Sequence, residues 1–274
     1  MKSVRHNEEA GVAGVEVERW TNTRRGPQIF HDDLAREEPL EIRVRGRGIA
    51  VTMRTPGDDE ELAAGFLLTE RILKKRSDFI EAAPCLSAEV PENVVNVFLA
   101  PRTEVDFGRL TRHVFSASSC GLCGKATIDA VHAHFPPVAT GPKISRRVLR
   151  ALPARMRRAQ ATFARTGGLH AAGLFDERGK LLVLREDVGR HNAVDKVLGC
   201  AFLKSWLPLD RHILLVSGRA SFEIMQKALA GRIAVVAAIS APSSLAVEFA
   251  RQSGQTLVGF LREDKMNLYS GGAS

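Results

Sequence analysis

The sequence predicts a mixed α/β protein, in which a small α+β unit precedes a larger unit built on a parallel sheet. The first half of the chain holds short runs that alternate between apolar and polar residues, which is typical of strands with one buried face. In the second half, runs that are apolar on both faces alternate with helical periods, which is typical of a parallel sheet covered by helices. We expect a mobile tail over residues 1–26, the small unit over 27–115 and the larger unit over 116–274.

The small unit begins with a predicted β-hairpin. Apolar residues alternate with charged ones over 40–45, large apolar residues recur at every second position over 49–53, and the turn between them holds two glycines. Residues 55–73 predict a helix, because acids fill its first turn and apolar residues follow at helical spacing. Residues 93–99 predict a further strand.

The larger unit begins with a second hairpin over 168–185, where a turn containing Asp, Glu, Arg and Gly separates two apolar runs. A helix with an apolar face follows it. Strands and helices then alternate, with strands predicted at 212–217, 233–240 and 256–262 and helices at 221–230 and 243–252.

Composition excludes several classes of protein. The 274 residues are 45% apolar and 26% charged, which is ordinary for a globular chain and excludes disordered or collagen-like sequences. No run approaches the roughly 18 apolar residues of a membrane span, and the first residues lack the apolar segment of a secretory signal. Four unevenly spaced cysteines do not form a disulfide framework, so we expect reduced thiols and a cytoplasmic protein.

Positive charge is concentrated in one stretch. The chain has a net charge of +8, and residues 141–165 hold eight bases and no acid. Two interpretations are open: the solvated face of a basic helix, or a platform for phosphates, an acidic protein or nucleic acid. Nucleic acid is disfavoured, because the stretch has one aromatic residue, Phe163, and the chain shows no motif of a nucleic-acid-binding domain.

The sharpest local feature is a pair of cysteines, Cys120 and Cys123, set among small residues before a predicted helix at 125–134. A thiol near a helix N-terminus has a lowered pKa and is a better nucleophile. Zinc would need two further ligands, and Cys85 and Cys200 are isolated in the sequence, so we expect no metal. Redox chemistry and sulfur transfer through a persulfide both remain open. Transfer suits the sequence better, because a redox pair usually follows an early βαβ strand.

Ligand-binding residues are expected where the parallel strands end. Ligands bind outside the carboxyl ends of such strands, and polar segments follow the predicted strands at 217–221, 240–244 and 262–265. Two of these segments lead into helix N-termini, which attract anions. With Arg219 and Arg262 they predict a site for a phosphate-bearing ligand, although the serine that opens each helix is explained equally well as its N-cap.

Charged and polar residues are also dense over 185–196, directly after an apolar strand. His191 and Asp195 lie one helical turn apart in this segment, with Asn192 between them, and we expect them to handle a cofactor or transfer a proton. An elaborate helix cap with a solvated face is the structural alternative. Cys200, on the apolar face of the same helix, is predicted to be a buried core cysteine.

Several motifs, in one order, resemble the FdhD family of formate dehydrogenase accessory sulfurtransferases. The resemblance extends from about Glu38 to Tyr269. The motifs lie at residues 55–57, 60–67, 119–124, 186–196, 217–219 and 259–269.

The resemblance implies a sulfurtransferase that accepts sulfur from a cysteine desulfurase as a persulfide on Cys120, with Cys123 as the partner thiol. The sulfur would pass to the molybdenum cofactor, a bis(molybdopterin guanine dinucleotide), which then enters the formate dehydrogenase apoenzyme. The larger unit would have a three-layer, cytidine-deaminase-like fold without the zinc site. GDP, which carries the same base and a diphosphate, is the natural analogue of this guanine dinucleotide.

The cofactor-binding segment of the family corresponds here to Phe260, Leu261, Arg262, Glu263, Asp264 and Lys265. Glu263 and Asp264 depart from the glycine that commonly follows the arginine in the family. Two acids facing a polyanion are unfavourable, so we expect contacts through the backbone. The alternatives are a zinc or redox enzyme and a cofactor-insertion chaperone without chemistry. We expect no membrane partner, and a homodimer is left open.

Overall fold

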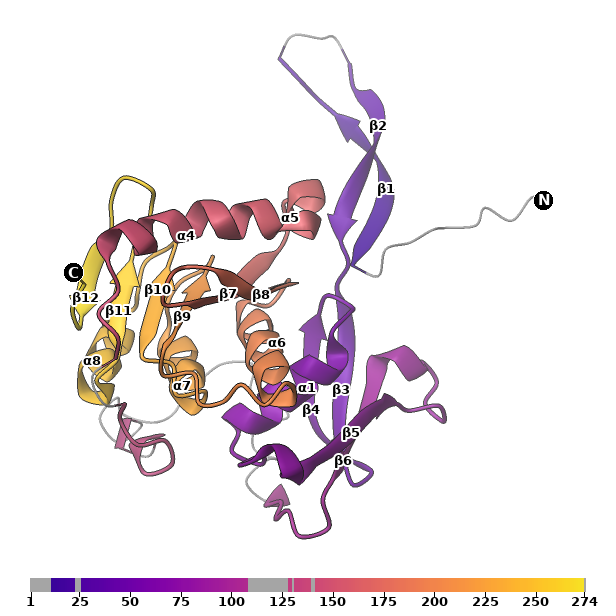
Figure 1. Cartoon of the computed structure of the whole chain (residues 1–274). Helices are drawn as coiled ribbons and strands as arrows, with labels where there is room; N and C mark the ends of the chain where they lie inside the picture. The colour runs from indigo at the N-terminus through magenta and orange to yellow at the C-terminus, as the bar shows by residue number, and fades with distance from the viewer. Residues whose placement is uncertain (1–10, 23–25, 108–127, 130, 139–140, 274) are drawn as a thin grey trace.

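The described residues of the computed structural model form three separate sheets (Figure 1). The structure describes residues 11–22, 26–107, 128–129, 131–138 and 141–273. A two-stranded ribbon precedes a four-stranded sheet, and a six-stranded sheet follows them. The mixed α/β class predicted from the sequence is confirmed. None of the described helices is long and apolar enough to cross a membrane.

The prediction of a mobile tail over residues 1–26 is wrong for residues 12–19, which form one strand of the two-stranded ribbon. β1 (Val12–Arg19) pairs antiparallel with β2 (Gln28–Ala35) along its whole length, and the ribbon projects from the rest of the molecule (Figure 1). Most of its side chains are exposed or half-buried, so β1 carries little of the apolar alternation by which a strand is recognised. Backbone pairing over eight positions, which no local pattern reveals, forms this strand.

The four-stranded sheet has the order β4-β3-β6-β5 and packs against α1. The predicted hairpin is confirmed: its turn uses Arg45 and Gly46, which both have positive φ, as the tight turns that match strand twist require. Alternate residues of β3 point into the core. The predicted helix and final strand are confirmed, and β5 is an additional strand. The elements are β3 (Glu38–Val44), β4 (Arg47–Arg54), α1 (Asp59–Thr69), β5 (Phe79–Pro84) and β6 (Val94–Leu99), with short 3-10 turns at Arg76–Asp78 and Pro91–Asn93.

The six-stranded sheet has the order β12-β11-β10-β9-β7-β8. Its central strands β9, β10 and β11 run parallel, as their two-sided apolar pattern predicts, whereas β7, β8 and β12 join through antiparallel pairings. β12 is a strand that the sequence did not indicate. The strands are β7 (His170–Asp176), β8 (Leu181–Asp187), β9 (His212–Val216), β10 (Val235–Ala238), β11 (Thr256–Gly259) and β12 (Asn267–Ser270).

Helices cover both faces of this sheet and make the expected three layers (Figure 1). α4 lies on one face, where Leu149, Leu152 and Met156 pack on the sheet; α6, α7 and α8 lie on the other. The helices are α4 (Arg146–Ala159), the short α5 (Ala161–Thr166), α6 (Arg190–Leu203), α7 (Phe222–Ala230) and α8 (Ser244–Ser253).

The four-stranded and six-stranded sheets share one hydrophobic core. α1, from the first unit, packs along α6, from the second, and a single cluster of buried residues continues from β3 to α8. Two glycines allow this approach. A Cβ on Gly199 of α6 would overlap the Glu61 carbonyl oxygen, and a Cβ on Gly65 of α1 would overlap that of Asp195. The helices therefore touch backbone to backbone.

Candidate functional site

Four strands of the large sheet end at one edge. β9, β10 and β11 are parallel, and β8 runs in the same direction because β7 is antiparallel to both β8 and β9. The loops that follow β9, β10 and β11 are tied together by backbone hydrogen bonds. Ala220 N donates to Ala241 O (3.1 Å), Ser243 N to Ala220 O (3.0 Å) and Phe260 N to Ser240 O (3.1 Å). The predicted convergence of the three polar segments is therefore confirmed.

Three helices begin at this edge: α6 after β8, α7 after β9 and α8 after β10, and the last two have serine caps. Ser221 Oγ accepts a hydrogen bond from Ile224 N (3.4 Å) at the start of α7, and Ser243 Oγ accepts one from Ala246 N (3.2 Å) at the start of α8. Both serines are thus N-caps, as the structural alternative required. Each cap takes up one of the free N–H groups of a first helical turn, so the positive ends of both dipoles still meet this edge.

Three arginines lie near these loops. Arg219 is exposed and makes no hydrogen bond or ion pair with any described residue. Arg262 is held against the backbone, since its Nη1 donates to the carbonyls of Leu261 (2.9 Å) and Ile239. Arg190, at the start of α6, has a buried Nε without a hydrogen-bond partner among the described residues. These cations and the positive ends of the helix dipoles lie at the edge, which also holds the carboxylates of Glu223, Glu263 and Asp264.

The segment 260–265 crosses the edge as a tight turn, in which Arg262 N donates to Lys265 O (2.8 Å). Leu261 is fully buried and anchors the turn in the core, whereas Glu263, Asp264 and Lys265 are exposed. Phe260 is 40% exposed and has a φ of 49°, in the left-handed region that a bulky side chain rarely adopts.

His191 is at this edge and contacts α7. Its Nε2 lies 2.8 Å from Glu223 Oε2 and 3.3 Å from Ser221 Oγ. The hydrogen bond from His191 lowers the pKa of Glu223, which keeps that carboxylate ionised. His170, the first residue of β7, lies beside Gly218; burial lowers its pKa, and Arg190 and His191 lower it further.

Asn192 and Asp195 contact other parts of the protein and not the loops of the edge. Asp195 is buried and pairs with Lys227 Nζ (2.8 Å); burial raises its pKa, which Lys227 opposes. Asp195 follows His191 by one turn on α6, and Lys227 follows Glu223 by one turn on α7. Two successive pairs of side chains therefore join α6 to α7. His191 and Asp195 thus each pair with a residue of α7, and the burial of Asp195 differs from the solvated helix face of the structural alternative.

Asn192 belongs to a buried polar network between the two units. Its Nδ2 donates to Met53 O (2.8 Å) and to Asp187 Oδ1 (3.0 Å). Asp187 is fully buried and forms an ion pair with Lys196 Nζ (2.8 Å), which also donates to Thr55 O (2.9 Å). This network fixes the start of α6, and with it Arg190 and His191, against the first unit.

The predicted sulfur-carrying residues, Cys120 and Cys123, lie outside the described residues. Cys200 is 1% exposed, which confirms it as a core cysteine, and Cys85 is buried. Among the residues that the structure describes, no group of three His, Cys, Asp or Glu side chains could hold a metal ion.

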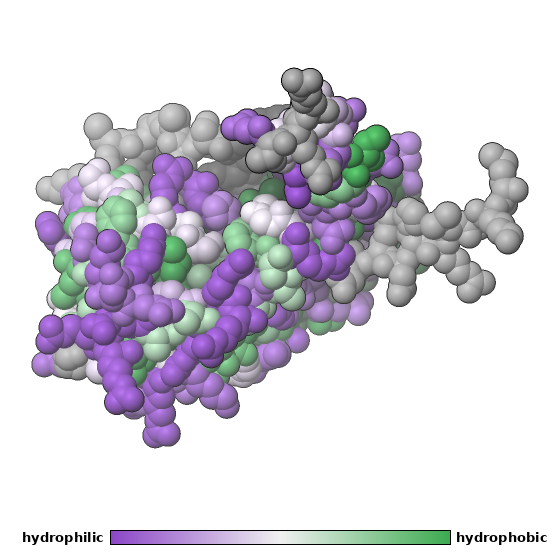
Figure 2. Space-filling model, turned by 90° about the horizontal axis from the view of Figure 1, so that it is seen from above, coloured by the Kyte–Doolittle hydropathy of each residue, from purple (hydrophilic) through white to green (hydrophobic). Residues whose placement is uncertain are grey.

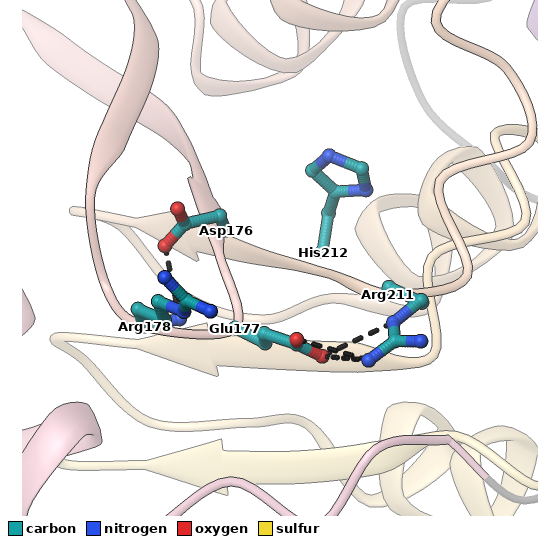
Figure 3. Close-up of a pocket in the computed structure, with 5 residues that line it drawn as sticks. All are labelled: Asp176, Glu177, Arg178, Arg211 and His212. Atoms are coloured by element: carbon teal, nitrogen blue, oxygen red, sulfur yellow. Dashed lines mark hydrogen bonds and ion pairs between the residues drawn. The ribbon is translucent and has the colours of Figure 1, made fainter.

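A pocket of about 240 Å³ lies at the opposite end of the sheet (Figure 3). Its walls come from the β7–β8 turn and the start of β9, and an ion pair between Glu177 and Arg211 (2.7 Å) crosses it. Asp176 is occupied by the backbone N–H groups of Arg178 and Lys180 (2.9 and 2.8 Å). This pocket is thus built from a turn and a surface ion pair, and the candidate site remains the carboxyl edge.

Three residues of the edge were not predicted as site residues from the sequence: His170, Arg190 and Glu223. Arg190 lies inside the motif at 186–196, so the density of charge there is the signal that could have found it. His170 reaches the edge because β7 runs antiparallel to its neighbours, and Glu223 because α7 packs beside α6. The positions of His170 and Glu223 depend on how the strands and helices are arranged in the fold, so no local sequence pattern could have identified them.

Comparison with known proteins matches this chain to one family. The FdhD/NarQ family model matches residues 35–274. A sulfur carrier protein FdhD of Streptomyces coelicolor is 53% identical over 247 residues, which cover 88% of each chain. One of Mycobacterium tuberculosis is 51% identical over 248 residues, covering 87% of this chain and 90% of that one.

A solved structure agrees with the sequence comparisons. The crystal structure of a provisionally assigned formate dehydrogenase accessory protein from Desulfotalea psychrophila superposes with a TM-score of 0.75 and 25% identity, covering 95% of this chain and 97% of that one. Sequence motifs, fold and relatives agree, and the chain belongs to the FdhD/NarQ family.

Proposed function

We propose that this protein is a sulfur carrier for the maturation of formate dehydrogenase. It accepts sulfur from a cysteine desulfurase as a persulfide on Cys120 and delivers it to a bis(molybdopterin guanine dinucleotide) molybdenum cofactor, which is its substrate. The names of its relatives support the sulfur-carrying role. The observation that carries the cofactor half of the proposal is the carboxyl edge, where four strand ends, three helix N-termini and Arg219 converge.

In the first step, the outer sulfur atom of the donor's persulfide passes to the Cys120 thiolate. The Cys120 thiolate attacks the outer sulfur of the donor's persulfide, an S–S bond forms on Cys120, and the donor's cysteine leaves as a thiolate. No net oxidation occurs. For release, the Cys123 thiolate attacks the inner sulfur of the Cys120 persulfide. The outer sulfur leaves as sulfide, reduced by two electrons, and the two cysteines become a disulfide that a cellular thiol must reduce.

The edge suits the dinucleotide because its groups carry complementary charge. Phosphates accept hydrogen bonds from free N–H groups at helix N-termini and from guanidinium groups. The 260–265 turn offers backbone groups beside the exposed Phe260 ring, and it directs Glu263 and Asp264 toward solvent. His191, next to Glu223 and Arg190, is the titratable side chain best placed to exchange a proton with a ligand at this edge.

The sulfur-carrying role is tested by mass spectrometry. Incubation with a cysteine desulfurase and cysteine is expected to add the mass of one sulfur atom to the peptide that contains Cys120. Cys120→Ala should abolish this addition and leave the melting temperature unchanged, and Cys85→Ala is the matched control. A chain that never gains sulfur would be a cofactor-insertion chaperone, and stoichiometric zinc in the purified protein would favour a metal enzyme.

The ligand site is tested by calorimetric titration of GDP. We expect GDP to bind, and Arg219→Ala to raise its dissociation constant by roughly ten- to hundredfold, which corresponds to the loss of one charge-assisted contact. Arg102→Ala, an exposed arginine of the first unit, is the control and should bind GDP as the parent does. Equal affinity of the Arg219 variant and the parent would place the nucleotide elsewhere.

A further inference from the structure

We propose that the exposed face of α4 is a docking surface for the acidic surface of a protein partner. This face lies on the side of the sheet opposite α6, α7 and α8 (Figure 1). It consists of cations that project from this helix and from the segment just before it. We call it the arginine face; it comprises Lys143, Arg146, Arg147, Arg150 and Arg158.

The folding of α4 separates its apolar and charged residues completely. Leu149, Leu152 and Met156 are at most 2% exposed and pack on the sheet. The five cations of the arginine face are exposed on the other side of the helix, because Arg147 and Arg158 are three turns apart and Arg146 and Arg150 one turn. Figure 2, which views the molecule from above, shows hydrophilic side chains gathered on this side.

The cations of the arginine face have no internal role. The three other arginines of the stretch do: Arg155 donates to the Gly179 carbonyl, Arg157 stacks over the Phe163 ring at 4.4 Å, and Arg165 pairs with Asp33 (3.0 Å). In contrast, no cation of the arginine face makes a hydrogen bond or ion pair with any residue in the described part of the chain. Residues 141–165 contain no acid to neutralise them. Their charges repel one another, and an anionic partner would relieve that repulsion.

The chemistry of the face favours carboxylates on a protein. Four of its five cations are arginines, whose planar guanidinium groups bind carboxylates through paired hydrogen bonds. A membrane surface is disfavoured, because the apolar side of α4 is buried on the sheet and has nothing to insert. Single-stranded nucleic acid is disfavoured as well. Phe163, the one aromatic residue of the stretch 141–165, is covered by Arg157, so the stretch offers no free ring on which a base could stack.

The size of the face fits a protein interface. Twelve residues separate Arg146 from Arg158, which is about 18 Å along the helix axis. A standard interface buries roughly 800 Å² on each partner, a patch about 28 Å across, so the arginine face would occupy its centre. This surface is independent of the sulfur chemistry proposed above, and its test involves neither cysteine.

The test measures binding of a fluorescently labelled poly-L-glutamate peptide by anisotropy. The variant Arg147→Gln/Arg150→Gln/Arg158→Gln removes three charges while keeping good helix formers. The matched control, Lys74→Gln/Lys75→Gln/Arg102→Gln, removes three exposed cations from the first unit. We expect the first variant to bind the peptide about tenfold more weakly than the parent and the control to bind it within twofold. Circular dichroism verifies that both remain folded.

Two results would overturn the proposal. Equal affinity of the parent and the arginine-face variant would show that acidic polypeptide does not bind there. A labelled DNA duplex serves as the second probe. If its affinity falls in the arginine-face variant as much as or more than that of the peptide, the face is a nucleic-acid surface instead.

Discussion

Replacing Gly199 by Ala sets two opposite effects against each other. In the interior of a helix the change favours folding by about 0.5–1 kcal/mol, because glycine loses more backbone freedom. Against this, the new Cβ would lie 2.8 Å from Gly65 N and 2.7 Å from the carbonyl carbon of Glu61, whereas real Cβ contacts essentially never fall below 3.0 Å. These atoms belong to the backbone of α1, so no side-chain rotation relieves the overlap and the two helices must move apart.

Overpacking of this kind costs about 1–3 kcal/mol and sometimes more, so we expect the packing cost to exceed the gain in helix propensity. After the gain in propensity is subtracted, a net destabilisation of about 0.5–2.5 kcal/mol remains, which corresponds to a melting temperature about 1–8 °C below that of the parent. Differential scanning calorimetry measures this. Gly272→Ala is the control, because its Cβ would meet nothing within 4 Å. A Gly199→Ala protein as stable as the parent would refute the backbone contact between α1 and α6.

Two further predictions concern buried and half-buried charges. Lys196→Met leaves the fully buried Asp187 carboxylate without its cation, and chemical denaturation should show a loss of about 3–5 kcal/mol. Lys180→Met, an exposed control, should change stability by no more than about 0.5 kcal/mol; a loss as small for Lys196 would contradict the pairing. The pKa of Glu223 is lowered in the folded state, so its ionised form stabilises the fold above the ordinary carboxyl pKa, and this contribution disappears as pH falls through the lowered value. Glu223→Gln should therefore melt below the parent at neutral pH and together with it in acid, and a difference that persists in acid would show that the lowered pKa is not the cause.

The carboxyl edge could be predicted from the sequence because it follows from a rule of topology. Strands with two apolar faces, separated by helices, run parallel, and their carboxyl ends then meet. The segments at 217–221, 240–244 and 262–265 were found in this way without any knowledge of their contacts. The ribbon strand β1 and the edge strand β12 could not be predicted, because both are short of buried side chains and depend on pairing with a neighbour.

The role of the segment 185–196 was harder to predict, for a physical reason. Its density of charge was apparent, but Asp187 and Thr55 are 132 positions apart in the sequence and meet only in the fold. Charge density is the same whether the charges face a ligand or one another. Here Asp187, Lys196 and Asp195 face other parts of the protein, and Arg190 and His191 remain at the edge.

The left-handed backbone conformation of Phe260 raises the question of why this position holds a phenylalanine. A non-glycine residue in the left-handed region costs about 1–3 kcal/mol, and a ring that is 40% exposed recovers only part of this by burial. Glycine would relax the turn, so folding alone does not select phenylalanine at this position. The backbone that carries this ring is fixed at the mouth of the sheet by the hydrogen bonds from Phe260 N to Ser240 O and from Leu261 N to Ala238 O. Under the proposed function, a backbone fixed in this way would present the ring to the planar base of a nucleotide with little further ordering of the main chain.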